Sequence, residues 1–191
     1  MTLADAIAAI EAKFTVLART EFRGETSLTV ERDRIAEVAA LAKELGFDTL
    51  VDLSSVDHFG QEPRFEVVYE LYSLSDNHHL RLKIAVSEDD LEVPSVIGVW
   101  RGADWHEREV WDMMGIRFPG HPDLRRILMW EGYPYFPLRK DFPLAGRSSD
   151  VPEVAFTKPA PLEGGPFVTV PGSFPGSSTV REREPRSRRR E

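Results

Sequence analysis

Two segments in which apolar and charged residues alternate constrain the fold of this chain more than any other feature. Residues 64–72 and 80–86 each place apolar side chains on one face and charged side chains on the other, the pattern of a half-buried strand. The charged residues of the two polar faces are Glu66, Glu70, Arg81 and Lys83. Because these charges are opposite in sign, we predict a hairpin with one apolar face that other elements must cover.

Two amphipathic helices are predicted to cover that face. The first spans residues 3–14, with Thr2 as the N-cap and Asp5 placed to complete a capping box. The second lies in the segment DRIAEVAALAKELGF, whose apolar residues recur at helical spacing. Gly46 stands where a helix commonly ends with a residue of positive φ.

Three shorter segments are predicted to extend the sheet. TSLTVE at 26–31 alternates, and FTVLARTEF before it is placed to pair with it across a turn at 23–25. TLVDL at 49–53 is a further short strand. The sequence therefore predicts an α+β fold, with a mixed or antiparallel sheet and amphipathic helices on one face.

The character of the chain changes after Pro94. A short helix is predicted from Ser95, and a longer one from Asp104, with Asp104 as its N-cap and Gly115 as its end. Ten of the fourteen prolines lie beyond Tyr133, and proline disfavours both helices and central strands. We therefore expect an α+β domain with a docking loop over residues 1–145, followed by an extended, Pro-rich C-terminal arm or disordered tail over 146–191.

Composition excludes several classes of function. The chain has no cysteine, which excludes disulfides, thiolate zinc sites and cysteine-ligated iron–sulfur clusters within it. The formal charge is −8, and it becomes −11 when the Arg-rich end, residues 181–191, is left out. An acidic body disfavours nucleic acid as the main partner. No apolar run is long enough to span a bilayer, and the first residues do not have the pattern of a signal peptide.

The densest stretch, EREVWDMMGIRFPGHPDLRRIL at 107–128, invites a catalytic interpretation that helix geometry disfavours. Glu107 and Glu109 are two residues apart, so their carboxylates point about 200° apart around a helix and cannot converge on one bond. Arg108 is spaced four residues from Asp104 and from Asp112, which predicts a stripe of ion pairs. We expect a structural or docking role for this helix.

A metal site is the main competing interpretation. His106 and Glu109, joined by His121 and Asp123 from the following loop, would serve a free-standing metal hydrolase. No H-E-x-x-H motif is present, and a His-Pro pair in a turn is more typical of a hydrogen-bonded loop anchor. Phosphate-binding loops, serine nucleophile motifs and dinucleotide fingerprints are also absent from the sequence.

The loop over residues 119–141 has the composition of a protein interface. Prolines stiffen it, and it carries four aromatic residues together with four basic ones: Arg125, Arg126, Arg139 and Lys140. Arginine and aromatic side chains are enriched at interface cores. We predict that the four basic side chains face a partner, although a loop packed on its own domain has the same composition.

At these residues the sequence resembles a known family. The stretch at 107–128, followed by PLRKDFPL, is similar to the signature of the C subunit, or 30 kDa subunit, of respiratory complex I, the proton-translocating NADH:quinone oxidoreductase. The resemblance covers roughly residues 1–145. The motif and expected interaction residues are Trp105, Glu107, Arg108, Glu109, Asp112, Gly115, Gly120, His121, Pro122, Asp123, Arg125, Arg126, Pro137, Leu138, Arg139, Lys140 and Asp141.

The resemblance implies a non-catalytic member of the peripheral arm. Its expected partners are the D subunit, which forms much of the quinone pocket and is called the quinone-pocket subunit below, and other peripheral-arm subunits. The resemblance implies no catalytic residue, cofactor or metal in this chain; FMN and iron–sulfur clusters belong to other subunits. It also implies a place on the cytoplasmic face of the bacterial inner membrane, with contact to the membrane only through the assembled complex. Related subunits occur in membrane-bound hydrogenase-type complexes, which is the alternative assignment.

Overall fold

The computed structural model describes residues 2–144 and 146. The chain divides into a first unit, residues 1–142, and a second unit that begins at residue 143. The helices and strands named below all belong to the first unit. The Pro-rich arm predicted over residues 146–191 lies outside the described residues, apart from Gly146.

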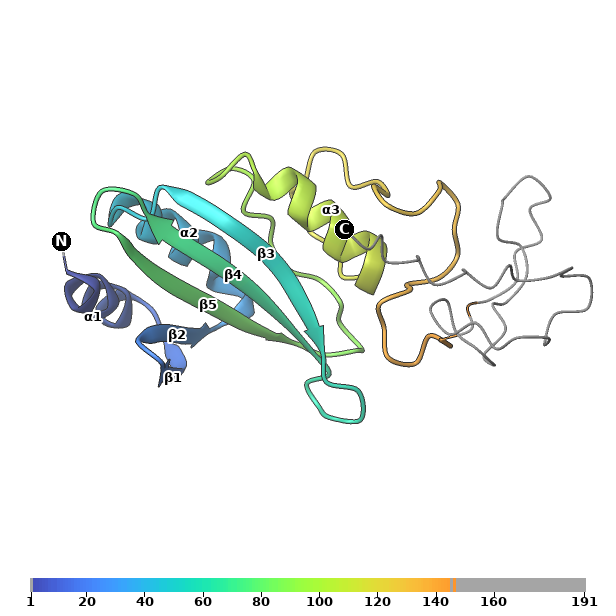
Figure 1. Ribbon diagram of the computed structural model, residues 1–191, viewed down its shortest axis with the longest axis horizontal. Coiled ribbons are helices and arrows are strands. Elements are labelled where there is room, and N and C mark those ends of the chain that lie inside the picture. Colours follow the sequence, from blue (N-terminus) through green and yellow to red (C-terminus); the bar gives the residue numbers. More distant parts are fainter. Residues whose placement is uncertain (1, 145, 147–191) are drawn as a thin grey trace, which may run out of the picture. The chain divides into compact units, whose positions relative to one another are not determined.

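A five-stranded mixed sheet forms the centre of the first unit (Figure 1). Its strands are β1 (Val16–Phe22), β2 (Glu25–Val30), β3 (Thr49–Asp57), β4 (Phe65–Ser73) and β5 (His78–Val86). Their spatial order is β1-β2-β5-β4-β3, with β2 and β5 parallel and each other neighbouring pair antiparallel. The predicted α+β architecture is confirmed.

The β4–β5 hairpin is stabilised by the opposite charges of its two polar faces. Glu70 lies directly opposite Arg81, and the two side chains form an ion pair. The Lys83 Nζ atom lies 2.8 Å from Glu66 on the neighbouring diagonal. The other face of the hairpin is apolar and buried along most of its length. The predicted pairing is therefore confirmed at both charged positions.

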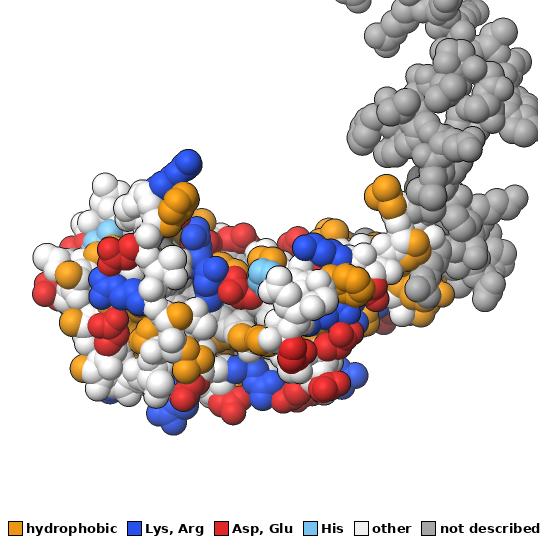
Figure 2. Space-filling view, turned by 90° about the horizontal axis from the view of Figure 1, so that it is seen from below, with side chains coloured by type: hydrophobic (Ala, Val, Ile, Leu, Met, Phe, Trp, Pro, Cys, Tyr) orange, Lys and Arg blue, Asp and Glu red, His pale blue; other side chains and the backbone are white. Residues whose placement is uncertain are grey.

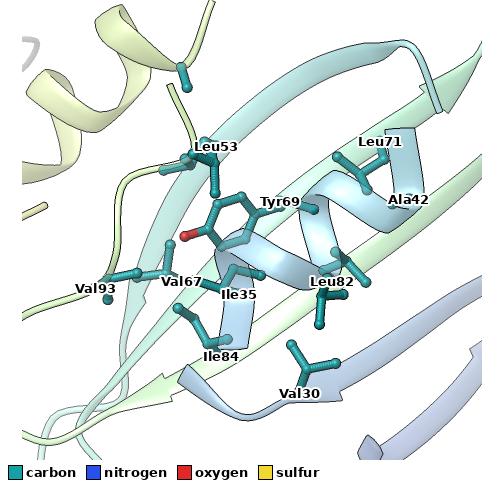
Figure 3. Packing of buried hydrophobic residues seen from close by; sticks show 14 of the residues in the cluster. Val30, Ile35, Ala42, Leu53, Val67, Tyr69, Leu71, Leu82, Ile84 and Val93 are labelled. Carbon is teal, nitrogen blue, oxygen red and sulfur yellow. The ribbon is translucent and has the colours of Figure 1, made fainter. Parts of the chain in front are cut away.

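Helices α1 (Leu3–Lys13) and α2 (Ile35–Glu44) cover that apolar face. Figure 3 shows Ile35 and Ala42 of α2 lying over the buried side chains of β4 and β5. The predicted capping box is present, since the Thr2 hydroxyl accepts from the Asp5 N–H at 3.2 Å and the Asp5 carboxylate accepts from the Thr2 N–H. Helix α2 follows a short 3₁₀ turn, η1 (Arg32–Arg34), and Gly46 has the expected positive φ of 100°.

Strand β3 is longer than the sequence predicts. The prediction ends it at Leu53, whereas it continues to Asp57. Two serines in this extension have low strand propensity, but each pairs with a residue of β4, for example Ser55 with Val67. Pairing within the sheet therefore overrides the local propensity.

The helix predicted from Ser95 is wrong, and the one predicted from Asp104 begins earlier. Only a single turn forms near Ser95, in which the N–H groups of residues 99 and 100 donate to the Val96 carbonyl. Helix α3 spans Ala103–Met114, with Gly102 as its N-cap and no side-chain cap, so Asp104 lies inside its first turn. The predicted end is confirmed, because Gly115 is the C-cap with φ of 81°. Helix α3 packs against β3 (Figure 1).

Candidate docking surface

Asp112 organises the loop that follows α3. Its side chain is fully buried, and one carboxylate oxygen accepts three backbone N–H groups, from residues 127, 128 and 129, at 2.7–3.0 Å. The other oxygen pairs with Arg126. Burial opposes ionisation, but these hydrogen bonds together outweigh it and lower the pKa of Asp112. A buried carboxylate with four donors fixes the loop against the helix.

Arg108 does not form the predicted ion-pair stripe along α3. Its guanidinium lies 3.8 Å from Asp104, but Asp112 is occupied by Arg126. Two other N–H groups of Arg108 donate to the carbonyls of Arg125 and Arg126, at 3.2 and 3.4 Å. The prediction is therefore right for one acid and wrong for the other, because an arginine of the following loop competes for Asp112.

Two of the four basic side chains predicted to face a partner point inward instead. The Arg126 side chain is 9% exposed and lies 5.4–5.6 Å from the rings of three aromatic residues. Arg139 is half-buried, donates to the Met114 carbonyl at 2.7 Å and stacks on Phe136. Guanidinium groups favour such stacked, hydrogen-bonded positions. Arg125 and Lys140 are exposed, so the prediction holds for their direction alone.

Gly115 is required where α3 meets this loop. A Cβ atom at this position would lie 2.6 Å from the Arg139 guanidinium and 2.8 Å from the Phe136 ring. The positive φ of Gly115 is also unfavourable for any residue with a side chain. The glycine therefore both ends the helix and makes room for the inward arginine.

Glu107 and Glu109 do not share a site. Glu107 is fully buried; its carboxylate accepts from the Val96 N–H at 2.7 Å and from the Ser95 hydroxyl at 2.6 Å. Burial raises the pKa of Glu107. Glu109 is exposed. The predicted divergence of the two carboxylates is confirmed, and Glu107 instead joins α3 to the turn at Ser95.

The candidate metal ligands are held apart. His121 Nδ1 accepts from the Asp123 N–H at 3.0 Å, so its other nitrogen is left to donate to the Asp104 carbonyl at 3.2 Å. His106 lies 3.2 Å from Asp52 of β3. Within the described part of the chain, no three His, Asp or Glu side chains are grouped to hold a metal ion. His121 is a hydrogen-bonded loop anchor, as its turn context predicts.

Large apolar side chains remain exposed around this network. They include Trp105 on α3 and Leu128 and Leu138 on the loop, at 62%, 61% and 57% exposure. Between β3 and α3 lies a shallow groove of about 100 Å³, lined in part by Met113, Glu109 and Leu138. We define the docking surface as the exposed side chains Trp105, Glu109, Arg125, Leu128, Leu138 and Lys140.

The sequence of this unit matches a known family over most of its length. Residues 28–148 match the model described as "Respiratory-chain NADH dehydrogenase, 30 Kd subunit". The chain belongs to this family.

Relatives in the 30 kDa subunit family support the assignment. A C 2 subunit of NADH-quinone oxidoreductase from Rhizobium etli is 51% identical over 137 residues, covering 70% of this chain and 73% of the relative. The C subunit from Geobacter sulfurreducens is 46% identical over 145 residues, covering 74% and 90%. Both relatives therefore match a similar share of this chain.

Solved structures show the same fold. A trypsin-resistant fragment of Nqo5 is 34% identical with a TM-score of 0.58, covering 65% of this chain and all of that fragment. A chain of an archaeal membrane-bound sulfane sulfur reductase has a TM-score of 0.64 at 23% identity, covering 73% of this chain and 85% of its own. That second likeness carries the fold alone.

The family motif divides into an inner and an outer set. The inward members are Glu107, Arg108, Asp112, Gly115, His121, Arg126, Pro137 and Arg139. The outward members are Trp105, Glu109, Gly120, Pro122, Asp123, Arg125, Leu138, Lys140 and Asp141. The inner set fixes the loop, and the outer set is what remains accessible to a partner.

Sequence reasoning missed two residues beneath this surface. Asp57 and Arg64 are both buried and contact the loop at residues 140 and 141. No periodicity signals them, since they lie 83 and 77 residues from those partners. The only pattern that includes Asp57 is its place in the segment DLSSVDHFG, which fits the family.

Proposed function

We propose that this chain is a non-catalytic peripheral-arm subunit of a proton-translocating NADH:quinone oxidoreductase, and that it scaffolds the quinone-reducing module by docking on the quinone-pocket subunit. The observation that carries the proposal is the pairing of a fixed polar network with exposed apolar side chains. Asp112 and Arg126 hold the loop, while Trp105 and Leu138 stay in solvent. Family membership supplies the kind of assembly.

The energetics favour a docking role. Fully burying a large apolar side chain contributes about 1.5–3 kcal/mol, so the exposed apolar residues of this surface supply a substantial part of a specific association. The internal hydrogen bonds already order the loop, which lowers the conformational entropy lost on binding. Exposed charges around it, including Arg125 and Lys140, then supply orientation.

Charge alone does not identify the partner. Figure 2 shows acidic and basic side chains interspersed over one face of the first unit, with hydrophobic side chains among them. Such a mixed surface suits a protein partner and gives no stripe for nucleic acid. We expect the chain to bind no nucleic acid and to reach the membrane only through the complex, on the cytoplasmic face of the bacterial inner membrane.

Cofactors are expected in other subunits. The chain has no cysteine to ligate an iron–sulfur cluster and no nucleotide-binding motif for FMN. Within the described residues no helix is long and apolar enough to cross a bilayer. Electron transfer and proton translocation then belong to the assembly, and this chain contributes to its geometry.

Two alternatives are weaker. The sulfane sulfur reductase chain shares the fold at 23% identity, which does not by itself favour a membrane-bound hydrogenase-type complex. The metal hydrolase loses its basis because His106 pairs with Asp52, whereas His121 contacts Asp104 and Asp123.

A pull-down of the tagged full chain from native membranes separates these assignments. The proposal predicts that the quinone-pocket subunit and other peripheral-arm subunits co-purify. Recovery of hydrogenase-type chains in their place would support the alternative, and recovery of the chain alone from intact membranes would contradict both.

A further inference from the structure

A buried ion pair joins the end of the sheet to the loop at residues 137–142. Arg64, which directly precedes β4, is 4% exposed. Its Nε and Nη2 groups donate to the two carboxylate oxygens of Asp57 at 2.9 and 3.0 Å, the bidentate geometry that arginine and carboxylate favour. Asp57 is equally buried.

Both members of the pair also hold the loop. The Asp57 Oδ2 atom accepts the backbone N–H of Lys140 at 2.7 Å. The Arg64 Nη2 atom lies 2.5 Å from the Asp141 carboxylate. The rings of Phe59 and Phe65 lie 4.9 and 4.8 Å from the guanidinium carbon and limit its freedom to turn away.

The same loop is fixed to α3 at its other end. The Leu138 N–H donates to the Met113 carbonyl at 3.2 Å, and the Arg139 side chain donates to the Met114 carbonyl. Residues 138–141 are therefore anchored to the helix on one side and to the sheet on the other. Leu138 and Lys140, two members of the docking surface, belong to this anchored segment.

We infer that Asp57 and Arg64 are positioning residues that set the affinity of the docking surface by holding residues 138–141 in their binding shape. The inference rests on the proposed docking function. The two residues are themselves buried, so they act through the loop and not by touching a partner. Ordering the loop before binding reduces the entropy lost on association, which raises affinity without adding a contact.

Arg64 offers a matched pair of variants. Asp141 and Glu88 both pair with it, at 2.5 and 2.6 Å, and their side chains are exposed to a similar extent, 47% and 51%. Only Asp141 belongs to the loop. Asp141→Asn and Glu88→Gln therefore each remove one half-exposed ion pair from the same guanidinium, but only the first variant releases the loop. Pairs this exposed contribute little to global stability.

The test combines hydrogen exchange of the full chain with its binding to the purified quinone-pocket subunit. Asp141→Asn is expected to speed exchange at the Lys140 amide at least about tenfold, to weaken binding about tenfold and to leave the melting temperature unchanged. Glu88→Gln is expected to change none of the three. A purely structural role would instead lower the melting temperature in both variants.

Two outcomes overturn different statements. If the Lys140 amide keeps its protection in Asp141→Asn, the positioning role is wrong, whatever the binding result. If the loop exchanges faster but binding to the quinone-pocket subunit is unchanged, the positioning of the loop stands and its part in docking is wrong. Loss of binding in Glu88→Gln without faster exchange also overturns the inference.

Discussion

On α3, two buried acids five residues apart are held in opposite ways. Glu107 accepts from a hydroxyl and one backbone N–H, and burial raises its pKa. Asp112 is also opposed by burial, but three N–H groups and Arg126 lower its pKa. The difference lies in the donors, because charged and multiple donors favour the ionised form. Glu107 is thus a residue through which pH affects the stability of this helix.

Glu107→Gln is predicted to change the pH dependence of stability. The folded-state pKa of Glu107 lies above its ordinary value of 4.5, so the folded chain holds this proton more tightly. The stabilisation that results is full below the unfolded pKa and is lost as pH rises through the folded pKa. The glutamine variant lacks this loss and should gain stability relative to the native chain as pH rises from about 4 to neutral. Urea unfolding across this range tests it; parallel curves would contradict the assignment.

Arg125→Lys and Arg126→Lys should differ sharply although the residues are adjacent. Arg126 pairs with the fully buried Asp112 and stacks among aromatic rings, so lysine cannot replace its geometry. We expect Arg126→Lys to lower the free energy of unfolding by about 1–3 kcal/mol. Arg125 is 67% exposed, and its lysine variant should stay within about 0.5 kcal/mol. Urea unfolding of the two variants measures both values, and equal losses would show that Arg126 is not an internal support.

At the scale of elements, local signals were predictable and distant pairings were not. The capping box at Thr2, the charges of β4 and β5 and the end of α3 at Gly115 each depend on residues close in sequence or on a simple alternation. The end of β3 depends on its pairing with β4. The inward turn of Arg126 depends on Asp112, fourteen residues away. Consecutive arginines carry no local signal that tells which of them turns inward.

Gly115→Ala is predicted to weaken the junction between α3 and the loop. The positive φ costs about 1–2 kcal/mol for a residue with a side chain, and the new Cβ would also displace Arg139 and Phe136. Gly120→Ala is the matched control, because its φ is also positive but its nearest neighbour would lie 3.8 Å away. Thermal unfolding should show the larger loss for Gly115→Ala. Equal losses would mean that the close approach to Arg139 has no energetic weight.

At the scale of the whole molecule, function depends on what the fold leaves exposed. The apolar face of the sheet is buried by α1 and α2, whereas Trp105 and Leu138 remain in solvent beside α3. Family membership assigns the chain to a respiratory assembly. The sequence predicted this region as an interface but placed too many of its basic residues outward. The outward set is smaller and more apolar than composition alone indicated.

The purified full chain is predicted to carry no redox cofactor. The absence of cysteine removes the usual cluster ligands, and no nucleotide motif is present. Visible absorption and metal analysis should therefore show no flavin, iron or zinc in stoichiometric amount. A stoichiometric cofactor would contradict the scaffold role and direct attention back to His106 and His121.

The most direct test of the docking role is the affinity of the purified full chain for the purified quinone-pocket subunit, measured for two variants of exposed aromatic residues. Trp105 belongs to the docking surface, whereas Phe22 lies on β1 at the opposite edge of the sheet with similar exposure, 67% against 62%. Trp105→Ala is predicted to weaken binding at least about tenfold, since a buried tryptophan is a common anchor of interfaces. Phe22→Ala is predicted to leave the affinity unchanged. Equal affinities, or a loss confined to Phe22→Ala, would contradict the docking role.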